Sequence, residues 1–309
     1  MKAYKINESL YDIRLDFEQT NFRNFLSTWV YKGKDICFLV DCGPTSTIKS
    51  LIKGLTNIGI KDEDLDYILL THVHIDHAGG VGDLLSYFSR AKVICHPKGI
   101  KHLINPKILW EGSKKALGVI AELYGKIKPV PEDRISFQET IANDKVRVLE
   151  TLGHAPHHQS YLFDQYLFVG EAAGIHQPLP ENFYIRPATP PIFDYDTWKT
   201  SIQKLLSENL KDHKICYPHL GMSENAEEML KMAQEQLSLW IQIITDLYDI
   251  KERLDFVVEL MAKLKKKDIY FANYELLDKD TKKRELTFAG NSIRGILGYI
   301  QKKREENKN

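Results

Sequence analysis

The seven residues at positions 71–77, Thr-His-Val-His-Ile-Asp-His, restrict what this 309-residue chain can fold into more than any other feature. They place three imidazoles and one carboxylate directly after a short apolar run at residues 67–70. Imidazole and carboxylate groups are good ligands for zinc, iron and manganese. Four such groups in one short stretch can serve two ions, so the segment predicts a metal site at the end of a buried strand.

The pattern of apolar residues predicts an α/β fold of mixed sheets with helices outside. Short apolar runs bounded by polar or turn residues predict strands at residues 10–17, 25–31, 36–43, 67–70, 92–95, 146–149, 166–169 and 214–217. The second and third of these are expected to form a hairpin. Helical spacing predicts helices from Thr45 to about Gly59, from Gly80 onward and over residues 198–210. Residues 99–130 are expected to form a less regular insert.

Strand patterns end near Gly221, and the rest of the chain is expected to be helical. Apolar residues recur at steps of three and four over residues 226–247 and again, after a shift of phase, over residues 250–264. This spacing predicts one long interrupted helix or two helices. Their apolar stripes are expected to pack on the core or on a second copy of the chain, which would make a homo-oligomer, because exposed stripes would leave a large apolar patch.

The composition disfavours several classes of partner. Lys plus Arg and Asp plus Glu both number 42, so no positive field attracts nucleic acid. The chain contains no leader pattern and no apolar run of ~18 residues, so we expect no membrane partner and a cytoplasmic location. Its four cysteines, Cys37, Cys42, Cys95 and Cys216, are scattered, which predicts reduced, buried thiols.

Three later side chains share one feature with the histidine segment, since each follows an apolar, strand-like run. They are His154 in Leu-Gly-His-Ala-Pro-His-His, Glu171 after Leu-Phe-Val-Gly, and His219 after Ile-Cys-Tyr-Pro. All of them could meet at one edge of the sheets.

With these residues the chain resembles the metallo-β-lactamase superfamily, whose pattern is His-x-His-x-Asp-His followed by a histidine, a bridging acid and a final histidine on separate loops. The resemblance covers roughly residues 1–221 and includes Asp41-Cys42-Gly43, which matches an Asp-x-Gly after an early strand. Residues 93–106 and 153–160 are most similar to uncharacterised hydrolases near the glyoxalase II and lactonase branches. The resemblance implies an αβ/βα sandwich of two mixed sheets with outer helices, formed by a catalytic domain over residues 1–221, and a helical extension over residues 222–309.

The resemblance also implies a site for two divalent metal ions, zinc first, with iron and manganese as alternatives. The first ion would be held by His72, His74 and His154. The second would be held by Asp76, His77 and His219. Glu171 stands where the family has a bridging aspartate, and its additional methylene can change the spacing of the metals. Occupancy of both positions therefore stays open.

The function implied by such a site is that of a hydrolase that uses a metal-bridging hydroxide on a small ester, thioester or lactone. Asp76 would be the catalytic residue that orients the nucleophile and carries its proton to the leaving group. Asp41 is expected to fix a ligand imidazole by accepting its other N–H. His157 and His158 are expected to support the ligands or pack beside them.

Residues 181–191 are expected to form a loop near the site, because they leave the sheet just after Glu171. Tyr184 and Arg186 in this loop, and His176 before it, are candidate contacts for a small-molecule substrate. Anchoring of the loop is the alternative role of Tyr184 and Arg186.

Other functions of the same fold stay open. A mononuclear non-haem iron dioxygenase, resembling the persulfide dioxygenases, would need the first-site residues and the acid but not the second set. The presence of Asp76, His77 and His219 favours the hydrolase. A metal-dependent ribonuclease would use the same ions, and the balanced charge disfavours it. A non-catalytic scaffold is disfavoured by the complete ligand set.

Overall fold

The structure is a computed structural model, and it describes residues 2–17 and 22–308. The chain divides into two compact units that are interleaved in sequence. Unit 1 comprises Met1–Glu150, Pro156–Gly170 and Cys216–Gly221, and unit 2 comprises Thr151–Ala155, Glu171–Ile215 and Met222–Asn309. The predicted boundary between residues 221 and 222 coincides with one of the points where the chain passes from unit 1 to unit 2. As a domain boundary it stays a prediction.

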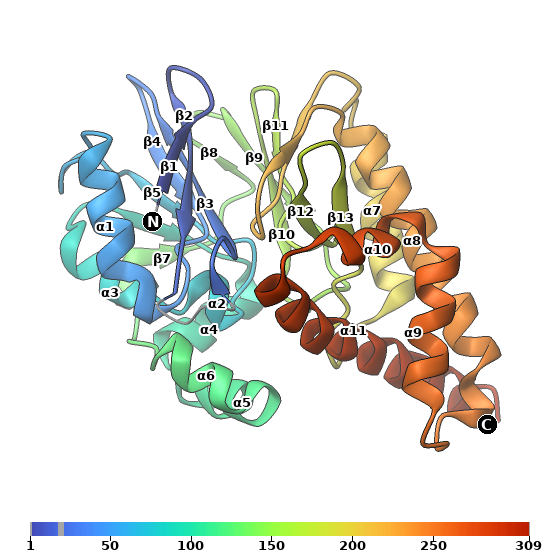
Figure 1. The fold of residues 1–309 in the computed structure, drawn as a ribbon. Helices are drawn as coiled ribbons and strands as arrows, with labels where there is room; N and C mark the ends of the chain where they lie inside the picture. Colours follow the sequence, from blue (N-terminus) through green and yellow to red (C-terminus); the bar gives the residue numbers. More distant parts are fainter. Residues whose placement is uncertain (1, 18–21, 309) are drawn as a thin grey trace. The chain divides into compact units, whose positions relative to one another are not determined.

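The first sheet of unit 1 is mixed, as predicted, and its described strands lie in chain order (Figure 1). They are β1 (Lys2–Lys5), β2 (Leu10–Leu15), β3 (Leu26–Lys32), β4 (Cys37–Val40), β5 (Tyr67–Leu69), β6 (Lys92–Ile94) and β7 (Ile135–Ser136). Strands β1 to β4 pair antiparallel, so the predicted hairpin of β3 and β4 is confirmed. Strands β4 to β7 pair parallel, because helical crossovers connect them.

The parallel strands end together, and this creates the edge on which the histidine segment lies. Val40 is in register with Leu69, and Leu69 is in register with Ile94. The chain therefore leaves the sheet at neighbouring points, at Asp41 after β4 and at residues 70–77 after β5. Helices α1 (Ile48–Asn57) and α3 (Val81–Tyr87) lie on the outer side of this sheet (Figure 1).

The other sheet of unit 1 contains β8 (Thr140–Ile141), β9 (Val146–Glu150), β10 (Gln159–Phe163) and β11 (Tyr166–Phe168), paired antiparallel. Cys216, the last residue of β14 (Lys214–Cys216), is hydrogen-bonded to the residue that follows β11, because the Val169 amide donates to the Cys216 carbonyl at 3.2 Å. Aromatic rings fill the space between the sheets, with Phe38 5.1 Å from Phe163 and 6.1 Å from Phe168 between ring centroids. Apolar faces of both sheets thus share one core.

The stretch at residues 99–130 is more regular than predicted. It forms α4 (Pro97–Ile104), α5 (Lys107–Leu117) and α6 (Val119–Tyr124). Pro106 precedes α5, and Gly118, with φ of +57°, separates α5 from α6. These two breaks divide the apolar spacing into pieces too short to indicate a helix in the sequence.

Unit 2 contains a hairpin of β12 (Ile175–Pro178) and β13 (Phe183–Arg186), followed by α7 (Tyr195–Ser207). The expectation of a loop over residues 181–191 is therefore wrong for Phe183–Arg186, which pair with β12 in antiparallel register. The short strand β15 (Met222–Ser223) lies beside β14.

The chain after β15 is helical, as predicted. It forms α8 (Ala226–Asp246), α9 (Phe256–Lys267), α10 (Ile269–Ala272) and α11 (Lys279–Glu306). Apolar spacing predicted separate ranges for the first two helices, whereas α11 was expected only as part of the helical extension. The buried face of α11 includes Thr281, Arg284, Glu285, Ser292 and Gly295, so its apolar stripe is interrupted by polar and small residues. No helix in the described part of the chain is long and apolar enough to cross a membrane.

All four cysteines are buried and unbridged, as predicted. Burial, reinforced by the nearby carboxylates of Asp66 and Asp64, raises the pKa of Cys37 to about 12. Burial also raises the pKa of Cys42 and Cys95. These thiols stay protonated near neutral pH, so they are packing groups and not nucleophiles.

Candidate metal centre

The histidine segment begins where β5 ends and turns directly into a short helix. His74 is the N-cap residue of α2 (Ile75–Ala78), with an extended backbone, and Asp76 and His77 lie within this helix. The carboxylate of Asp76 is favoured in the first helical turn, where backbone N–H groups point outward. The change from extended backbone at His74 to a helical turn sets the directions in which the side chains of His74, Asp76 and His77 point.

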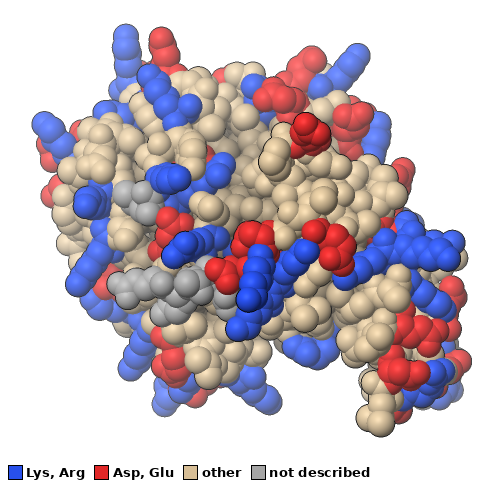
Figure 2. Space-filling model, viewed as in Figure 1, with Lys and Arg blue, Asp and Glu red and all other residues tan. Residues whose placement is uncertain are grey.

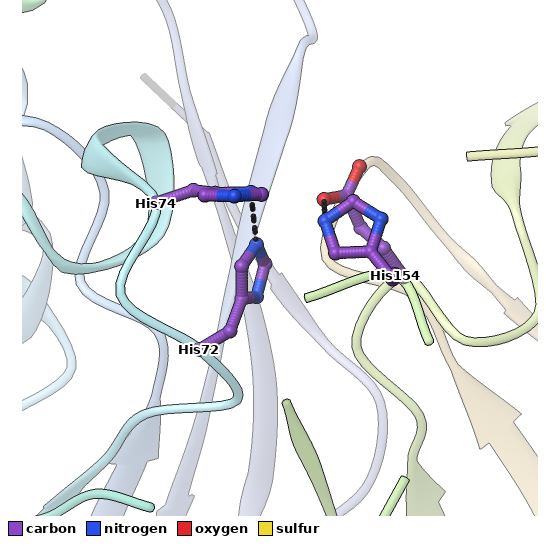
Figure 3. A group of neighbouring side chains, drawn as sticks. His72, His74 and His154 are labelled. Carbon is purple, nitrogen blue, oxygen red and sulfur yellow. Dashed lines mark hydrogen bonds and ion pairs between the residues drawn. The ribbon is translucent and has the colours of Figure 1, made fainter. Parts of the chain in front are cut away.

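His72 and His74 form the first cluster, which lies in unit 1. His72 Nε2 and His74 Nδ1 lie 2.9 Å apart, and Figure 3 shows the two rings facing each other edge-on through these atoms. The ring centroids are 4.5 Å apart at an interplanar angle of 81°. His72 is fully buried, while His74 is half-buried.

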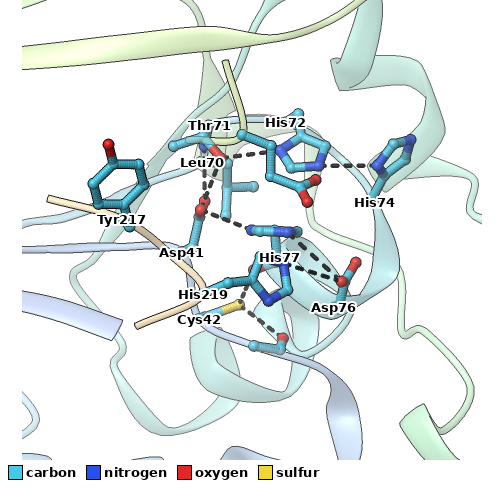
Figure 4. A network of polar contacts seen from close by, with 12 residues as sticks. Asp41, Cys42, Leu70, Thr71, His72, His74, Asp76, His77, Tyr217 and His219 are labelled. Atoms are coloured by element: carbon cyan, nitrogen blue, oxygen red, sulfur yellow. Dashed lines mark hydrogen bonds and ion pairs between the residues drawn. The ribbon is translucent and has the colours of Figure 1, made fainter. Parts of the chain in front are cut away.

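Asp76, His77 and His219 form the second cluster, also in unit 1 (Figure 4). Their candidate ligand atoms all lie within 4.8 Å of one another. Oδ2 of Asp76 is 3.7 Å from Nε2 of His77 and 3.7 Å from Nε2 of His219. The Phe25 carbonyl, 3.1 Å from Nδ1 of His219, accepts the proton of that nitrogen and leaves Nε2 directed at Asp76. A site of two imidazoles and one carboxylate suits a divalent transition metal.

Asp41 connects the two clusters of unit 1 by hydrogen bonds (Figure 4). Its Oδ2 lies 3.0 Å from Nδ1 of His77 and accepts from the hydroxyl of Thr71 at 2.7 Å. Because that hydroxyl donates its proton to Asp41, its lone pair accepts the Nδ1 proton of His72, 3.0 Å away. The imidazoles of His72 and His77 are thus both bound through Nδ1, and each presents Nε2 as the ligand atom. Contact between Asp41 and a ligand imidazole was expected, and its role toward a bound ion stays a prediction.

His157 and His158 lie beside the first cluster within unit 1. The His158 ring is 5.2 Å from the His72 ring, and the His157 ring is 5.8 Å from the His74 ring, centroid to centroid. The Val73 amide donates to Nδ1 of His157 at 3.4 Å. Their position matches the expected supporting role, which stays a prediction.

His154 and Glu171 form the third cluster, which lies in unit 2. Nε2 of His154 is 2.7 Å from Oε2 of Glu171 (Figure 3). On the other side of the ring, Nδ1 lies 2.9 Å from the Ala188 carbonyl and donates its proton there. Nε2 of His154, on the opposite side of the ring, then faces the Glu171 carboxylate. An imidazole nitrogen and a carboxylate oxygen this close to each other could both bind one cation.

The candidate substrate contacts lie in the hairpin of unit 2. The His176 ring is 5.3 Å from the Phe183 ring. Tyr184 is completely buried against Phe271, and burial raises its pKa. Arg186 is also buried and forms an ion pair with Glu285 at 2.7 Å. These contacts anchor both side chains within unit 2, and a substrate role for the three residues stays a prediction.

The donor set fits divalent metal ions. Its atoms are imidazole nitrogens and carboxylate oxygens, and hydrogen bonds to Asp41, Thr71 and two backbone carbonyls hold four of the rings in the ligating tautomer. Outer hydrogen bonds of this kind are typical of metal-binding histidines. Sequence reasoning missed Thr71, although its place directly before the first histidine is a signal. It also missed the Ala188 and Phe25 carbonyls, for which a sequence offers no signal, since every residue has one.

Replacing Thr71 by valine is expected to weaken zinc binding about 10- to 100-fold, as loss of an outer hydrogen bond to a ligand does. Valine keeps the shape of threonine but cannot hold His72 and Asp41 in their present orientation. Competition with a chromophoric chelator measures the affinity. Thr71→Ser, which keeps the hydroxyl, is the control and should bind like the parent. Equal affinities for the valine and serine variants would contradict the role of the hydroxyl.

Comparison with known proteins identifies the family. Residues 23–219 match the model of the metallo-beta-lactamase superfamily. The metallo-beta-lactamase fold-containing protein ST1585 of Sulfurisphaera tokodaii is 30% identical over 233 residues, which are 71% of this chain and 84% of that protein. The crystal structure of ST1585, described as from Sulfolobus tokodaii, aligns with a TM-score of 0.62 at 28% identity and covers 76% of this chain and 87% of that chain.

Two more distant matches agree in fold or in part of the sequence. The metallo-beta-lactamase family protein TTHA1429 of Thermus thermophilus is 18% identical, with a TM-score of 0.65 over 97% of this chain and 95% of its own. A hydroxyacylglutathione hydrolase of Actinobacillus pleuropneumoniae is 34% identical over 110 residues, 35% of this chain and 36% of that protein. The predicted place near the glyoxalase II and lactonase branches stays a prediction. The chain belongs to the metallo-β-lactamase superfamily and is a metallohydrolase of that fold.

Proposed function

We propose that this protein hydrolyses a small ester, thioester or lactone with the help of two divalent metal ions. The observation that carries the proposal is the cluster of Asp76, His77 and His219, a complete second ligand group held by outer hydrogen bonds. A mononuclear oxygenase does not need this group. Similarity to a hydroxyacylglutathione hydrolase over part of the chain supports hydrolysis as the reaction class.

The proposed ligand sets are those that the family pattern implies. His72, His74 and His154 would hold one ion, with Glu171 as the bridging acid, and Asp76, His77 and His219 would hold the other. Bound zinc would lower the pKa of a coordinated water toward 7 and polarise a carbonyl oxygen. Iron and manganese are the alternatives, since both accept the same nitrogen and oxygen ligands.

Asp76 is the proposed proton carrier because its surroundings differ from those of the histidines in its cluster. Its side chain is 17% exposed, whereas that of His77 is fully buried and that of His219 is 4% exposed. The Nδ1 protons of the two histidines are held by Asp41 and the Phe25 carbonyl. Asp76 is therefore the member of this cluster that can orient a water, accept its proton and release it to a leaving group.

The charge distribution supports a small-molecule substrate over nucleic acid. Basic and acidic residues are equal in number, and Figure 2 shows them interspersed on the face that it presents. A surface that binds a polyphosphate backbone would gather Lys and Arg along one stripe. The proposal therefore places carbonyl substrates before phosphodiesters.

Removal and return of metal tests the proposed function. We expect the parent protein to contain two metal ions per chain and to cleave at least one member of a panel of p-nitrophenyl esters, thioesters and lactones. Dialysis against a chelator should abolish cleavage, because no side chain of the site is a strong nucleophile, and added zinc should restore it. Elemental analysis and absorbance assays measure both effects. Metal-dependent cleavage of RNA with no activity on the carbonyl panel would overturn the proposal.

A further inference from the structure

The long C-terminal helix α11 holds a segment of unit 2 by buried hydrogen bonds. The Ser292 hydroxyl donates to the Pro187 carbonyl at 2.8 Å, and the Thr189 hydroxyl donates to the Ser292 carbonyl at 2.8 Å. Nη1 of Arg186 donates to the Ser292 hydroxyl at 3.2 Å. Arg186, Thr189 and Ser292 are each at most 4% exposed. The Pro187 carbonyl and the Thr189 hydroxyl, on either side of Ala188, are thus both hydrogen-bonded to Ser292 of α11.

Gly295, one turn after Ser292 on the same face of α11, permits this close approach. A Cβ atom at Gly295 would lie 2.0 Å from the Thr189 carbonyl oxygen and 2.5 Å from the Pro190 carbonyl oxygen. Both contacts are with backbone, so a larger residue would have to displace the segment or the helix. Gly298, one turn further along, is different, because a Cβ atom there would meet no atom within 4 Å.

The segment held by α11 carries the hydrogen-bond acceptor of His154. Its Ala188 carbonyl lies 2.9 Å from Nδ1 of His154 and, by accepting that proton, leaves Nε2 facing Glu171. Ala188 lies between Pro187 and Thr189, the two residues that Ser292 binds. Displacement of this backbone would move the Ala188 carbonyl and release the ring of His154 from its ligating orientation.

We propose that α11 is a positioning element of the metal site: Ser292 and Gly295 hold the 187–190 backbone so that the Ala188 carbonyl fixes His154 as a metal ligand. The inference rests on the ligand role of His154 in the proposed function and extends it to a helix that carries no metal ligand itself. Ser292 and Gly295 act through the Ala188 carbonyl, so they are positioning residues and not catalytic ones.

Gly295→Ala in the full-length protein tests the inference, with Gly298→Ala as the matched control on the same helix. Zinc alone is the probe, and competition with a chromophoric chelator gives the affinity of each site. We expect Gly295→Ala to weaken one of two zinc sites about 10- to 100-fold, the usual effect of disturbing a ligand's outer hydrogen bond. Gly298→Ala should bind zinc like the parent. A parent-like zinc affinity of folded Gly295→Ala would overturn the inference.

His154→Ala separates a positioning role from general damage to the fold. If α11 acts through His154, adding Gly295→Ala to His154→Ala should change zinc affinity by less than about twofold. An equal loss in both backgrounds would show that the effect does not pass through His154 and would overturn the inference. If Gly295→Ala does not fold, Ser292→Ala replaces it in the same cycle, with an expected loss of about two- to tenfold for one hydrogen bond.

The same measurements distinguish failure of the inference from failure of the proposed function. Parent-like zinc affinity in His154→Ala would reject His154 as a ligand, and the inference would fall with it. Weak zinc binding in His154→Ala together with parent-like binding in Gly295→Ala would reject the inference alone. Absence of activity on every ester, thioester and lactone of the panel in the zinc-loaded parent would reject the hydrolase, while the chelator titrations would still decide the role of α11.

Discussion

Replacing His77 by alanine is expected to reduce the metal content from two ions per chain to one and to lower esterase turnover at least about 100-fold. His77 Nε2 lies 3.7 Å from the Asp76 carboxylate, so its loss removes one of the three candidate ligands in the second cluster. A metal ion contributes several kcal/mol to stabilisation of the transition state, and each 1.4 kcal/mol corresponds to about tenfold in rate. Elemental analysis and steady-state kinetics on parent and variant measure both quantities.

His213→Ala is the matched control for this experiment. His213 lies in unit 2 between α7 and β14, belongs to none of the candidate metal groups of the described chain, and should lose neither metal nor turnover when replaced. A different result for the parent and His77→Ala would favour the iron dioxygenase. If the parent contains one iron per chain and His77→Ala keeps both the iron and the rate, the second cluster binds no catalytic metal, and the two-metal hydrolase is wrong.

Replacing Glu285 by glutamine is expected to lower the free energy of unfolding by about 3–5 kcal/mol, the usual cost of removing one member of a buried ion pair. Glu285 is 1% exposed and accepts from Nε of Arg186 at 2.7 Å and from Nε of Arg284 at 3.1 Å. Glutamine keeps the shape of the side chain but removes the negative charge that accepts from both buried guanidinium groups. Urea denaturation of parent and variant measures the difference.

Glu305→Gln on the same helix is the control, because Glu305 is exposed and its replacement should change stability by no more than about 0.5 kcal/mol. A stability of Glu285→Gln within that range would contradict the structural role of the pair. The metal content of Glu285→Gln, measured where the variant is fully folded, shows whether the pair also contributes to the positioning role of α11.

The stabilisation by Glu285 should depend on pH in a defined direction. Burial alone would raise the pKa of Glu285, but Arg186 and Arg284 together lower it below the usual range. A carboxylate whose pKa is lower in the folded state stabilises the fold above its unfolded pKa of about 4.3 and loses this effect as pH falls through the folded value. The difference in urea midpoint between parent and Glu285→Gln should therefore be constant near neutral pH and shrink below about pH 4. A difference that grows on acidification would contradict this assignment.

The local pattern of the chain was sufficient to predict strands β2 to β5, which precede the histidine segment, and the mixed α/β architecture. A short apolar run bounded by polar residues, such as residues 67–70, is typical of a buried strand, so the polar ligands after it were expected where that strand leaves the sheet. The family pattern also supplied His154, Glu171 and His219 as further ligands. The helices at residues 99–130 were not predicted, because Gly118 divides their apolar pattern. α11 was expected only as part of the helical extension, without a range of its own, because buried polar residues interrupt its apolar stripe.

Only the tertiary structure showed which groups orient the ligand imidazoles, because backbone carbonyls that do so cannot be recognised from a sequence. The Ala188 and Phe25 carbonyls that accept from His154 and His219 are backbone groups, chemically the same at every position. In the sequence nothing distinguishes Gly295 from other glycines. Its importance comes from the close approach of the Thr189 carbonyl, which lies more than one hundred positions earlier in the chain. The types of ligand residue follow from local sequence, whereas their tautomers depend on contacts between distant segments, and such contacts exist only after folding.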